Sequence, residues 1–317
     1  MVQTRRLNIE RLEDRVTPST SGITWPDGDH LTLSFVPDGT SVSGYKSNLF
    51  QTLNAVGATP AWQQAILQAF QTWAAQANLN VGVVADGGQP LGTSGAVQGD
   101  SRFGDIRIAA APLGGNTLMT NTQFQWSGTT WSGDVVVNSS YKFNLTGAAG
   151  GYDLYTCMLN EVGNVFGVLD SHTDTTSGVY YQYVGPKTGI TAGDVADIRS
   201  LYGARSADPY RAAGSNSTRS TATNLGLALN GVSLQADLSA ANTQEWFRFA
   251  VPTLNLLGPQ VIGLNVHLGT TGLSCLVGSL QVYDAAGNLL TTASATDPLH
   301  GDLTVQTGGG LLTQLLG

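Results

Sequence analysis

The sequence predicts an α+β protein built of two parts, and three observations support this fold class. Residues 60–78 repeat apolar side chains at the three- and four-residue spacing of an amphipathic helix, whereas residues 31–36 alternate as a strand does. After residue 220 the chain offers only short strand-like runs separated by turns. We therefore expect strands with about three helices in residues 23–205 and an antiparallel β-sandwich in residues 221–317.

The strands of the first part are predicted from alternation and from short apolar runs. Leu31, Leu33 and Phe35 alternate with polar residues before a turn at 37–39, which predicts a half-buried strand. Residues 110–132 are rich in Gly, Thr and Asn, so we expect a long loop or a sheet edge there. Three further runs are typical of strands: 81–84, 105–109 and 133–137.

Helices are predicted at three places. A helix over residues 152–166 can end at Gly167. A helix over residues 191–202 is indicated by Thr191-Ala-Gly-Asp194, which has the spacing of a capping box. The amphipathic helix at 60–78 should pack its stripe against a sheet, although an aromatic stripe could also indicate a cofactor surface. That stripe consists of Trp62, Ile66, Phe70, Trp73 and Ala77.

The second part follows a polar segment, residues 206–220, which is rich in chain-breaking residues and predicts a linker. Turns such as 284–288 separate the strand-like runs beyond it, as in a small β-sandwich. The pattern allows a sandwich that lacks its last strand or two. The predicted strands are 232–238, 246–251, 261–268, 280–283, 289–292 and 303–305.

Composition narrows the classes of partner. Hydrophobic residues make up 41% of the chain, enough for packed cores, and charged residues only 11%. The net charge of −8 and the lack of a basic stripe argue against a nucleic-acid partner. No apolar run approaches the ~18 residues that cross a bilayer. Cys157 and Cys275 are too few for a disulfide framework, so we expect two buried thiols.

The N-terminal segment, residues 1–22, has the composition of a tail. Arg5 and Arg6 are not followed by an apolar core, so an ordinary secretory signal peptide is not expected. Residues 11–19, RLEDRVTPS, resemble the L-E-x-R-x-x-P motif at the start of many planctomycete surface and exported proteins. That resemblance implies an extracellular or cell-surface location, and a short charged tail without a sorting role is the alternative.

The most informative motif lies in the predicted helix and the turn after it. Residues 160–170, NEVGNVFGVLD, have the spacing of the zinc signature H-E-x-x-H-x-x-G-x-x-H. Glu161 and Gly167 occupy the glutamate and glycine positions of that signature. The three histidine positions hold Asn160, Asn164 and Asp170.

Several landmarks accompany this motif in order: Trp25, Leu31–Val36, Ala61–Ala74, Gly104–Ile108, Ser132–Val137, Tyr152–Tyr155 and Leu201–Gly203. With them, residues 23–205 resemble the catalytic domain of a matrixin, the metzincin branch of the zinc endopeptidases. The resemblance implies a mixed twisted sheet with about three helices. Through residues 245–249 and 282–288, the second part is similar to the bacterial pre-peptidase C-terminal domain, a β-sandwich often appended to secreted peptidases.

The resemblance implies a role for each position of the motif. The family's zinc ligands map to Asn160, Asn164 and Asp170, its general base to Glu161, and its turn glycine to Gly167. The family's methionine turn maps to residues 177–181, with Tyr180 at or near the methionine position. Cys157 lies on the same helix and cannot serve as the family's propeptide cysteine.

These substitutions change the expected chemistry. A catalytic zinc needs three protein ligands and an open position for water. A neutral side-chain amide is a poor zinc ligand, so we expect no tight zinc binding and no activated water for Glu161. The sequence therefore predicts a pseudo-peptidase, an extracellular binding or structural module for a protein or peptide, with matrixin proteolysis lost or severely weakened.

Other interpretations stay open at this point. An active or weakly active metalloendopeptidase would hydrolyse peptide bonds with Glu161 as general base. The oxygen atoms at 160, 161, 164 and 170 could instead bind Ca²⁺ or Mg²⁺, and His172 could add a weak metal ligand. The two asparagines could also simply hydrogen-bond where the family holds zinc. Adhesion or carbohydrate binding would depend on Trp126, Trp131 and Trp246.

Overall fold

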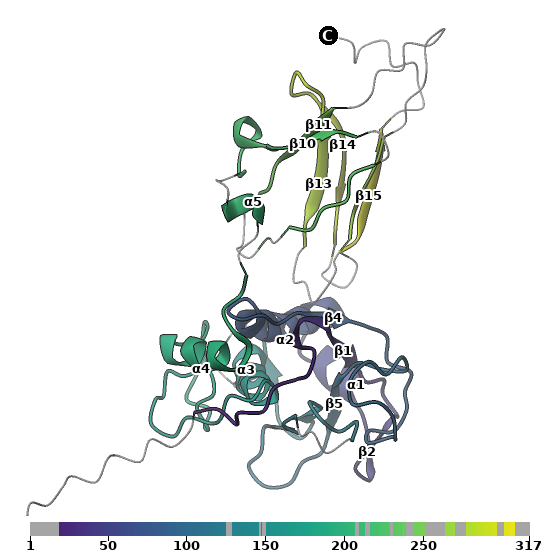
Figure 1. Cartoon of the computed structure of the whole chain (residues 1–317). Helices are drawn as coiled ribbons and strands as arrows, with labels where there is room; N and C mark the ends of the chain where they lie inside the picture. The colour runs from purple at the N-terminus through teal and green to yellow at the C-terminus, as the bar shows by residue number, and fades with distance from the viewer. Residues whose placement is uncertain are drawn as a thin grey trace, which may run out of the picture.

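The computed structural model describes residues 19–124, 129–145, 147, 150–206, 209–212, 216–228, 231–236, 238, 244–250, 264–269, 277–296 and 301–307. Figure 1 shows the strands after residue 220 gathered in a lobe of their own, apart from the lobe that contains the first helices. The boundaries predicted for the linker stay predictions. Several features of the sequence analysis lie outside the described residues: Arg5, Arg6, the 11–18 part of the N-terminal motif, Trp126 and Cys275.

A five-stranded mixed sheet forms the centre of the first lobe. Its strands lie in the order β4 (Val81–Val83), β1 (Leu31–Phe35), β5 (Ile106–Ala111), β7 (Val135–Asn138) and β6 (Met119–Asn121). The first four strands run parallel to one another, and β6 runs antiparallel to β7 at the edge. The α+β class is confirmed, and the glycine-rich segment 110–132 contains an edge strand between loops.

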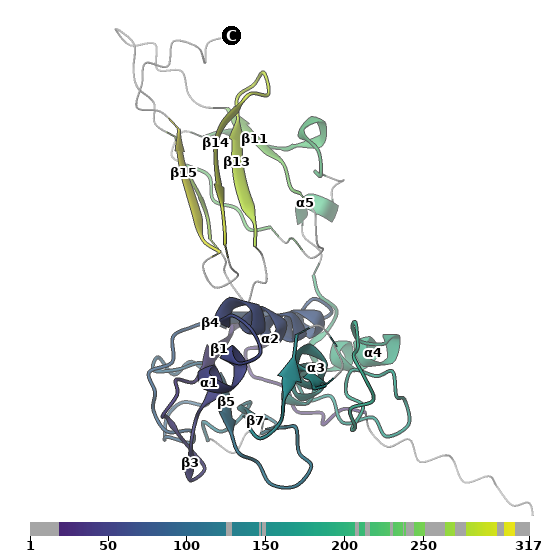
Figure 2. The ribbon, with the colours of Figure 1, turned by 180° about the vertical axis from the view of Figure 1, so that it is seen from behind.

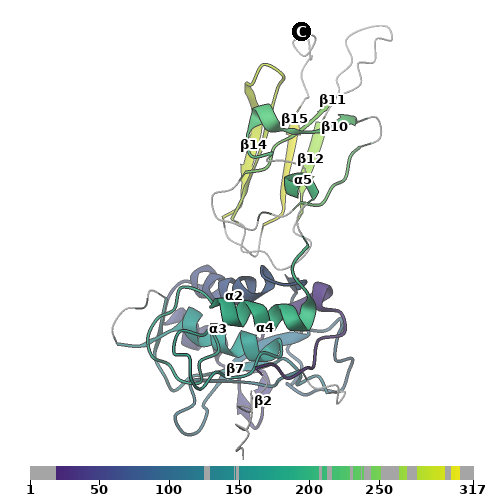
Figure 3. The ribbon, with the colours of Figure 1, turned by 60° about the vertical axis from the view of Figure 1, so that its left-hand side comes forward.

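Four helices accompany this sheet, one more than predicted. They are α1 (Leu49–Asn54), α2 (Thr59–Ala74), α3 (Leu154–Val165) and α4 (Ala192–Tyr202). The additional helix α1 has only six residues and buries Leu49 and Leu53. A segment of this length is too short to show a helical period in the sequence. Figure 2 shows α2 and α3 side by side, and Figure 3 shows α4 on the same side of the lobe.

Apolar side chains of α2 and α3 form the main core together with side chains from one face of the sheet. Trp62, Ile66, Phe70 and Trp73 have no exposed surface, so the aromatic stripe packs inside the protein as expected. Gly163 permits the close approach of the helices, because a Cβ atom there would lie 2.7 Å from Cζ2 of Trp73. The core therefore holds α3 firmly against α2.

The opposite face of the sheet is also covered, and this corrects the half-buried strand predicted at 31–36. Only Thr32 of β1 is partly exposed, and Ser34 is fully buried. Arg107 of β5 lies under the loop that follows β4 and binds Asp86 with contacts of 2.9 and 2.8 Å. The smaller core on this face consists of Val36, Val42, Leu91, Ala109, Ala111 and Val136.

Short elements complete the first lobe. The pair β2 (Ser41–Val42) and β3 (Tyr45–Lys46) is antiparallel, whereas β8 (Phe143–Asn144) and β9 (Tyr152–Asp153) are parallel. A 3₁₀ turn, η1 (Gly28–His30), precedes β1. After the first lobe come α5 (Pro209–Ala212) and η2 (Arg219–Thr221).

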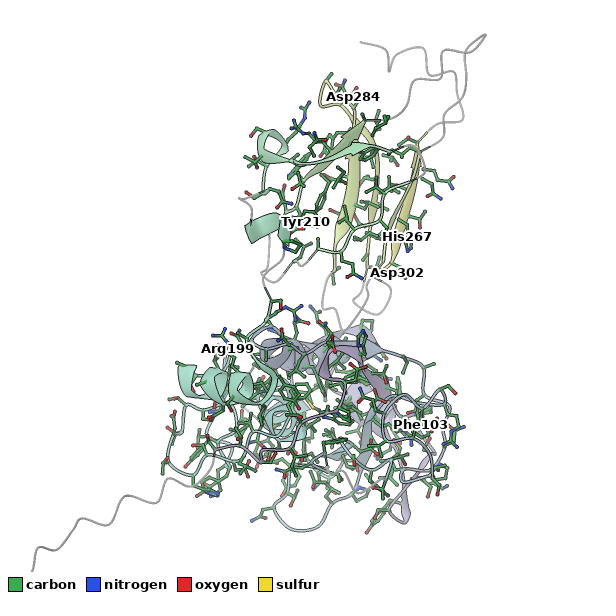
Figure 4. The ribbon with its side chains drawn as sticks, viewed as in Figure 1. Phe103, Arg199, Tyr210, His267, Asp284 and Asp302 are labelled. Atoms are coloured by element: carbon green, nitrogen blue, oxygen red, sulfur yellow. The ribbon has the colours of Figure 1, made fainter. Side chains whose placement is uncertain are left out.

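The second lobe contains three described strand pairs. The pairs β12 (Leu264–Leu268) with β15 (Leu303–Thr307) and β13 (Ser279–Tyr283) with β14 (Leu289–Ser294) are antiparallel. Figure 4 places Asp284, at the turn from β13 to β14, and Asp302, just before β15, at opposite ends of this lobe.

Two predictions for this lobe are wrong. The third pair, β10 (Thr223–Leu227) with β11 (Phe247–Ala250), is parallel rather than antiparallel. The strand predicted at 232–238 is the second error: its described residues, 232–236 and 238, belong to no strand. Within the described part of the chain, no helix has the length and apolar character that a membrane crossing requires.

Candidate functional site

Helix α3 presents the motif, and its two ends are fixed by local interactions. Asp153 caps the first turn, where its side chain accepts a hydrogen bond of 2.8 Å from the Thr156 amide. Gly167 ends the helix in the left-handed region with φ of 93°. A Cβ atom at Gly167 would lie 2.7 Å from the carbonyl oxygen of Ile23. The glycine expected to turn the chain toward Asp170 is therefore required by both its backbone conformation and its surroundings.

The first described residues of the chain support this turn. The Ser21 amide donates a hydrogen bond of 2.8 Å to the Gly167 carbonyl, and the Leu169 amide donates one of 2.8 Å to the Ser19 carbonyl. A short antiparallel bridge thus pairs Thr20 with Val168. These bonds fix the backbone immediately before Asp170.

The three positions that the matrixin resemblance assigns to zinc ligands lie together and bond to one another or to the turn at 177–181. Asn164 Nδ2 donates to Asp170 Oδ1 at 3.0 Å and to the Asn160 carbonyl at 3.1 Å. Asn160 Nδ2 donates to the Tyr180 carbonyl at 3.3 Å. Asn164 is buried, Asn160 is half-buried and Asp170 is exposed. The motif residues are therefore brought together as the spacing predicts.

The orientation of both amides follows from their acceptors. Turning the Asn160 amide over would place its oxygen against the Tyr180 carbonyl oxygen, and neither atom carries a proton. Turning the Asn164 amide over would place its oxygen against two acceptors, from Asn160 and Asp170. Each asparagine therefore presents its NH₂ group at these contacts.

Glu161 lies beside these residues and is buried, with 8% of its surface exposed. Asn121 of the edge strand β6 donates a hydrogen bond of 2.6 Å to Glu161 Oε2. Burial raises the pKa of Glu161 to about 7, and the Asp170 carboxylate acts in the same direction, whereas the Asn121 hydrogen bond lowers it. This carboxyl therefore changes its charge near neutral pH.

The turn at 177–181 is held by hydrogen bonds to Asp194 of α4. Asp194 accepts hydrogen bonds from the Ser177 hydroxyl at 2.6 Å and from the Gly178 amide at 2.8 Å. Tyr180 follows this anchor and presents its carbonyl to Asn160. Residue 180 thus contacts the motif through its backbone. A methionine at this position would not be needed for that contact.

His172 does not join the motif through any hydrogen bond found among the described residues. Its ring is exposed and packs on Tyr181 with centroids 4.5 Å apart. Tyr181 in turn contacts Tyr180 edge to face at 5.1 Å. The result is an aromatic surface beside Asp170.

Cys157 and the described tryptophans have packing contacts. The Cys157 thiol is free and buried, and burial raises its pKa far above the usual range, so it stays protonated. Trp131 packs against the smaller core. Trp246 is half-buried and packs on Tyr283 with ring centroids 5.2 Å apart.

Two further residues belong to the site and were missed by sequence reasoning. Asn121 contacts Glu161, and Gln123 donates a hydrogen bond of 3.4 Å from Nε2 to Asn164 Oδ1. Asn121 is the last residue of β6 and Gln123 follows two residues later, where Thr122 still bonds to Gly133 and Asp134, so the two side chains lie on one side of this segment. The two-residue spacing of Asn121 and Gln123 was the only sequence signal that both side chains face the same way. It indicates the site only when β6 is known to lie beside α3.

The donor set does not fit the zinc that the matrixin resemblance implies. The two amide nitrogens act as hydrogen-bond donors and have no lone pair to offer a metal. Ca²⁺ prefers six to eight oxygen ligands. Here Asn164 Oδ1 accepts from Gln123, and one oxygen of Glu161 accepts from Asn121. Two of the oxygen atoms that could bind calcium are therefore already engaged by hydrogen bonds.

Elsewhere in the described residues, one group could offer metal ligands. Asp27, Asp29 and His30 are all exposed, and their ligand atoms lie within 4.8 Å of one another. His30 Nδ1 contacts Asp27 Oδ1 at 2.9 Å and Asp29 Oδ1 at 3.4 Å. The pairing raises the pKa of His30, chiefly through its hydrogen bond to Asp27. Exposed acidic groups of this kind are common without a metal.

No model of a known protein family matches this sequence, and no curated protein does.

Proposed function

We propose that this chain is an extracellular protein with a matrixin-like peptidase fold that binds a protein or peptide without hydrolysing it. The carrying observation is the bond of 3.0 Å between Asn164 and Asp170. It joins two positions that would both have to face a zinc ion in an active matrixin. The mixed sheet with its antiparallel edge supports the fold assignment, and the N-terminal motif supports export.

The edge strand β6 could bind a polypeptide ligand by backbone hydrogen bonds. On either side of β6, the Thr122 amide donates to the Asp134 carbonyl and the Leu118 carbonyl accepts from the Asn138 amide, both toward β7. Because residues alternate along an antiparallel pair, the backbone groups of Asn121 point to the other side. No strand pairs with β6 on that side among the described residues. An extended peptide could add there as a further strand, close to α3.

The second lobe is proposed to be a pre-peptidase C-terminal-like β-sandwich. The antiparallel pairs β12–β15 and β13–β14 support this, and β15 also packs beside β13 and β14. The half-buried Trp246 gives no independent support for a carbohydrate-binding role, because its ring already packs on Tyr283.

The test compares the natural chain with a variant that restores the family's ligands. The full chain is purified, zinc and calcium are counted by elemental analysis, and casein hydrolysis is measured with and without a chelator. We expect less than one equivalent of zinc and no chelator-sensitive hydrolysis. The triple variant Asn160→His, Asn164→His and Asp170→His should gain zinc and measurable hydrolysis.

A matched control adds Glu161→Gln to the triple variant, which should bind zinc but hydrolyse nothing, since the general base is lost. One tightly held zinc in the natural chain, together with chelator-sensitive casein cleavage, would overturn the proposal.

One observation favours a second candidate, a weakly active metalloendopeptidase. A general base works best when its pKa lies near the working pH, and the pKa of Glu161 is about 7. The same natural-chain assay decides between the two. Slow hydrolysis that disappears in Glu161→Gln would establish the second candidate.

A further inference from the structure

We propose that the side-chain amides of Asn160 and Asn164 form a metal-free cross-link that holds the segment after Gly167 against α3. The inference rests on the proposed function, because a catalytic metal would need the same positions. It goes further by assigning these two residues a structural role in the loop after Gly167. The amides would tie together the parts of the chain that meet at the site.

The hydrogen bonds connect α3 with three other segments. Gln123, just after β6, donates to Asn164 at 3.4 Å. Asn164 donates to Asp170 at 3.0 Å, on the far side of the Gly167 turn. Asn160 donates to the Tyr180 carbonyl at 3.3 Å. Two side chains one helical turn apart thus reach the edge strand, the loop at 170 and the turn at 180.

The loop from 169 to 190 has little regular structure of its own to hold it. Its described residues form neither a helix nor a strand, and their β-pairing is limited to the bridge between Ser171 and Tyr180. Asp194 anchors the start of the 177–181 turn from α4. Asn160 supplies the matching anchor from α3 through the Tyr180 carbonyl, so the turn is held at both ends.

A double-mutant cycle on the central bond tests this cross-link. Asn164→Ala, Asp170→Ala and the double variant are made in the full chain, and thermal midpoints and amide hydrogen exchange are measured. Each single variant should lower the midpoint by a few degrees. The double variant should lose no more than the worse single one, because both remove the same bond. Exchange should accelerate at residues 168–181.

Asp170→Asn is the matched control. It keeps the shape of the side chain and an oxygen that can accept from Asn164, so exchange at 168–181 should stay slow. A chelator should leave the midpoint of the natural chain unchanged. Since Asp170 is exposed, its variants should fold, and the exchange readout stands even if Asn164→Ala does not.

The outcomes separate this inference from the proposed function. Additive midpoint losses with unchanged exchange would overturn the cross-link and leave the proposed function intact. A midpoint that falls on adding chelator would overturn the cross-link, because a bound metal would then be holding the loop. Casein cleavage by the natural chain would overturn the proposed function, while the cycle would still decide the cross-link.

Discussion

The Asp194 carboxylate on α4 accepts a hydrogen bond of 2.6 Å from the Ser177 hydroxyl and so fixes the turn beneath the site. The same carboxylate completes the capping box with Thr191. Both the helix start and the turn therefore depend on one buried side chain.

Replacing this carboxylate should be costly. Asp194→Ala removes the cap and both anchors of the turn, so we expect a loss of ~2–4 kcal/mol in the free energy of unfolding. Ser177→Ala removes one of these bonds and should cost about 1 kcal/mol. Denaturant titration measures both. Equal losses for the two variants would contradict a shared anchor.

The pKa of Glu161 makes stability depend on pH. Its pKa is raised from 4.5 to about 7, so the folded state holds this proton more tightly than the unfolded state does. The stabilisation is complete below about pH 4.5 and is lost as pH rises through about 7. The Glu161→Gln side chain stays neutral, so this variant should lose less stability than the natural chain as the pH rises from about 4.5 to above 7. The two losses in the free energy of unfolding should differ by up to about 3 kcal/mol.

The effect of Glu161 is the difference between the free energies of unfolding of the natural chain and of Glu161→Gln at each pH. Burial also raises the pKa of Asp134 and that of Asp105, so both contribute a dependence of the same sign in either protein. Parallel curves for the natural chain and Glu161→Gln between pH 4.5 and 8 would show that Glu161 does not titrate there.

The buried ion pair behind the sheet gives a third prediction. The side chains of Arg107 and Asp86 are almost fully buried. Burial by itself would raise the pKa of Asp86, but the hydrogen bond from Arg107 helps to lower it below its usual value. Arg107→Met leaves this carboxylate unpaired and should cost ~3–5 kcal/mol in denaturant titration. The double variant with Asp86→Asn should recover part of that loss. No recovery would mean that packing of Arg107 on Phe103, 4.4 Å away, dominates.

Gly163→Ala tests the approach of the turn to α3. The new Cβ atom would lie 2.3 Å from Cγ1 of Val179, so we expect a loss of ~1–3 kcal/mol. Gly193→Ala in α4 is the matched control, since its nearest atom is Thr191 Oγ1 at 3.5 Å. It should stabilise the protein by ~0.5–1 kcal/mol through helix propensity. Thermal unfolding of both variants checks the opposite signs.

Sequence reasoning succeeded where a segment was long enough to show its period. Helices α2, α3 and α4 were placed to within a few residues, and the capping box at Thr191 is present. It failed for α1, which has only six residues, and for β10, which was not predicted as a strand. The parallel pairing of β10 with β11 was also not predicted, because pairing partners leave no periodic trace in either strand.

For the site, the spacing of the motif determined that Asn160 and Asn164 share one face of a helix and that Gly167 turns the chain. These are local consequences of backbone geometry, which every residue carries with it. Only the tertiary structure decided which acceptors the two amides meet and that Asn121 reaches Glu161. Hydrogen bonds between distant segments depend on how helices, sheet and loops pack, and that packing is a property of the whole chain.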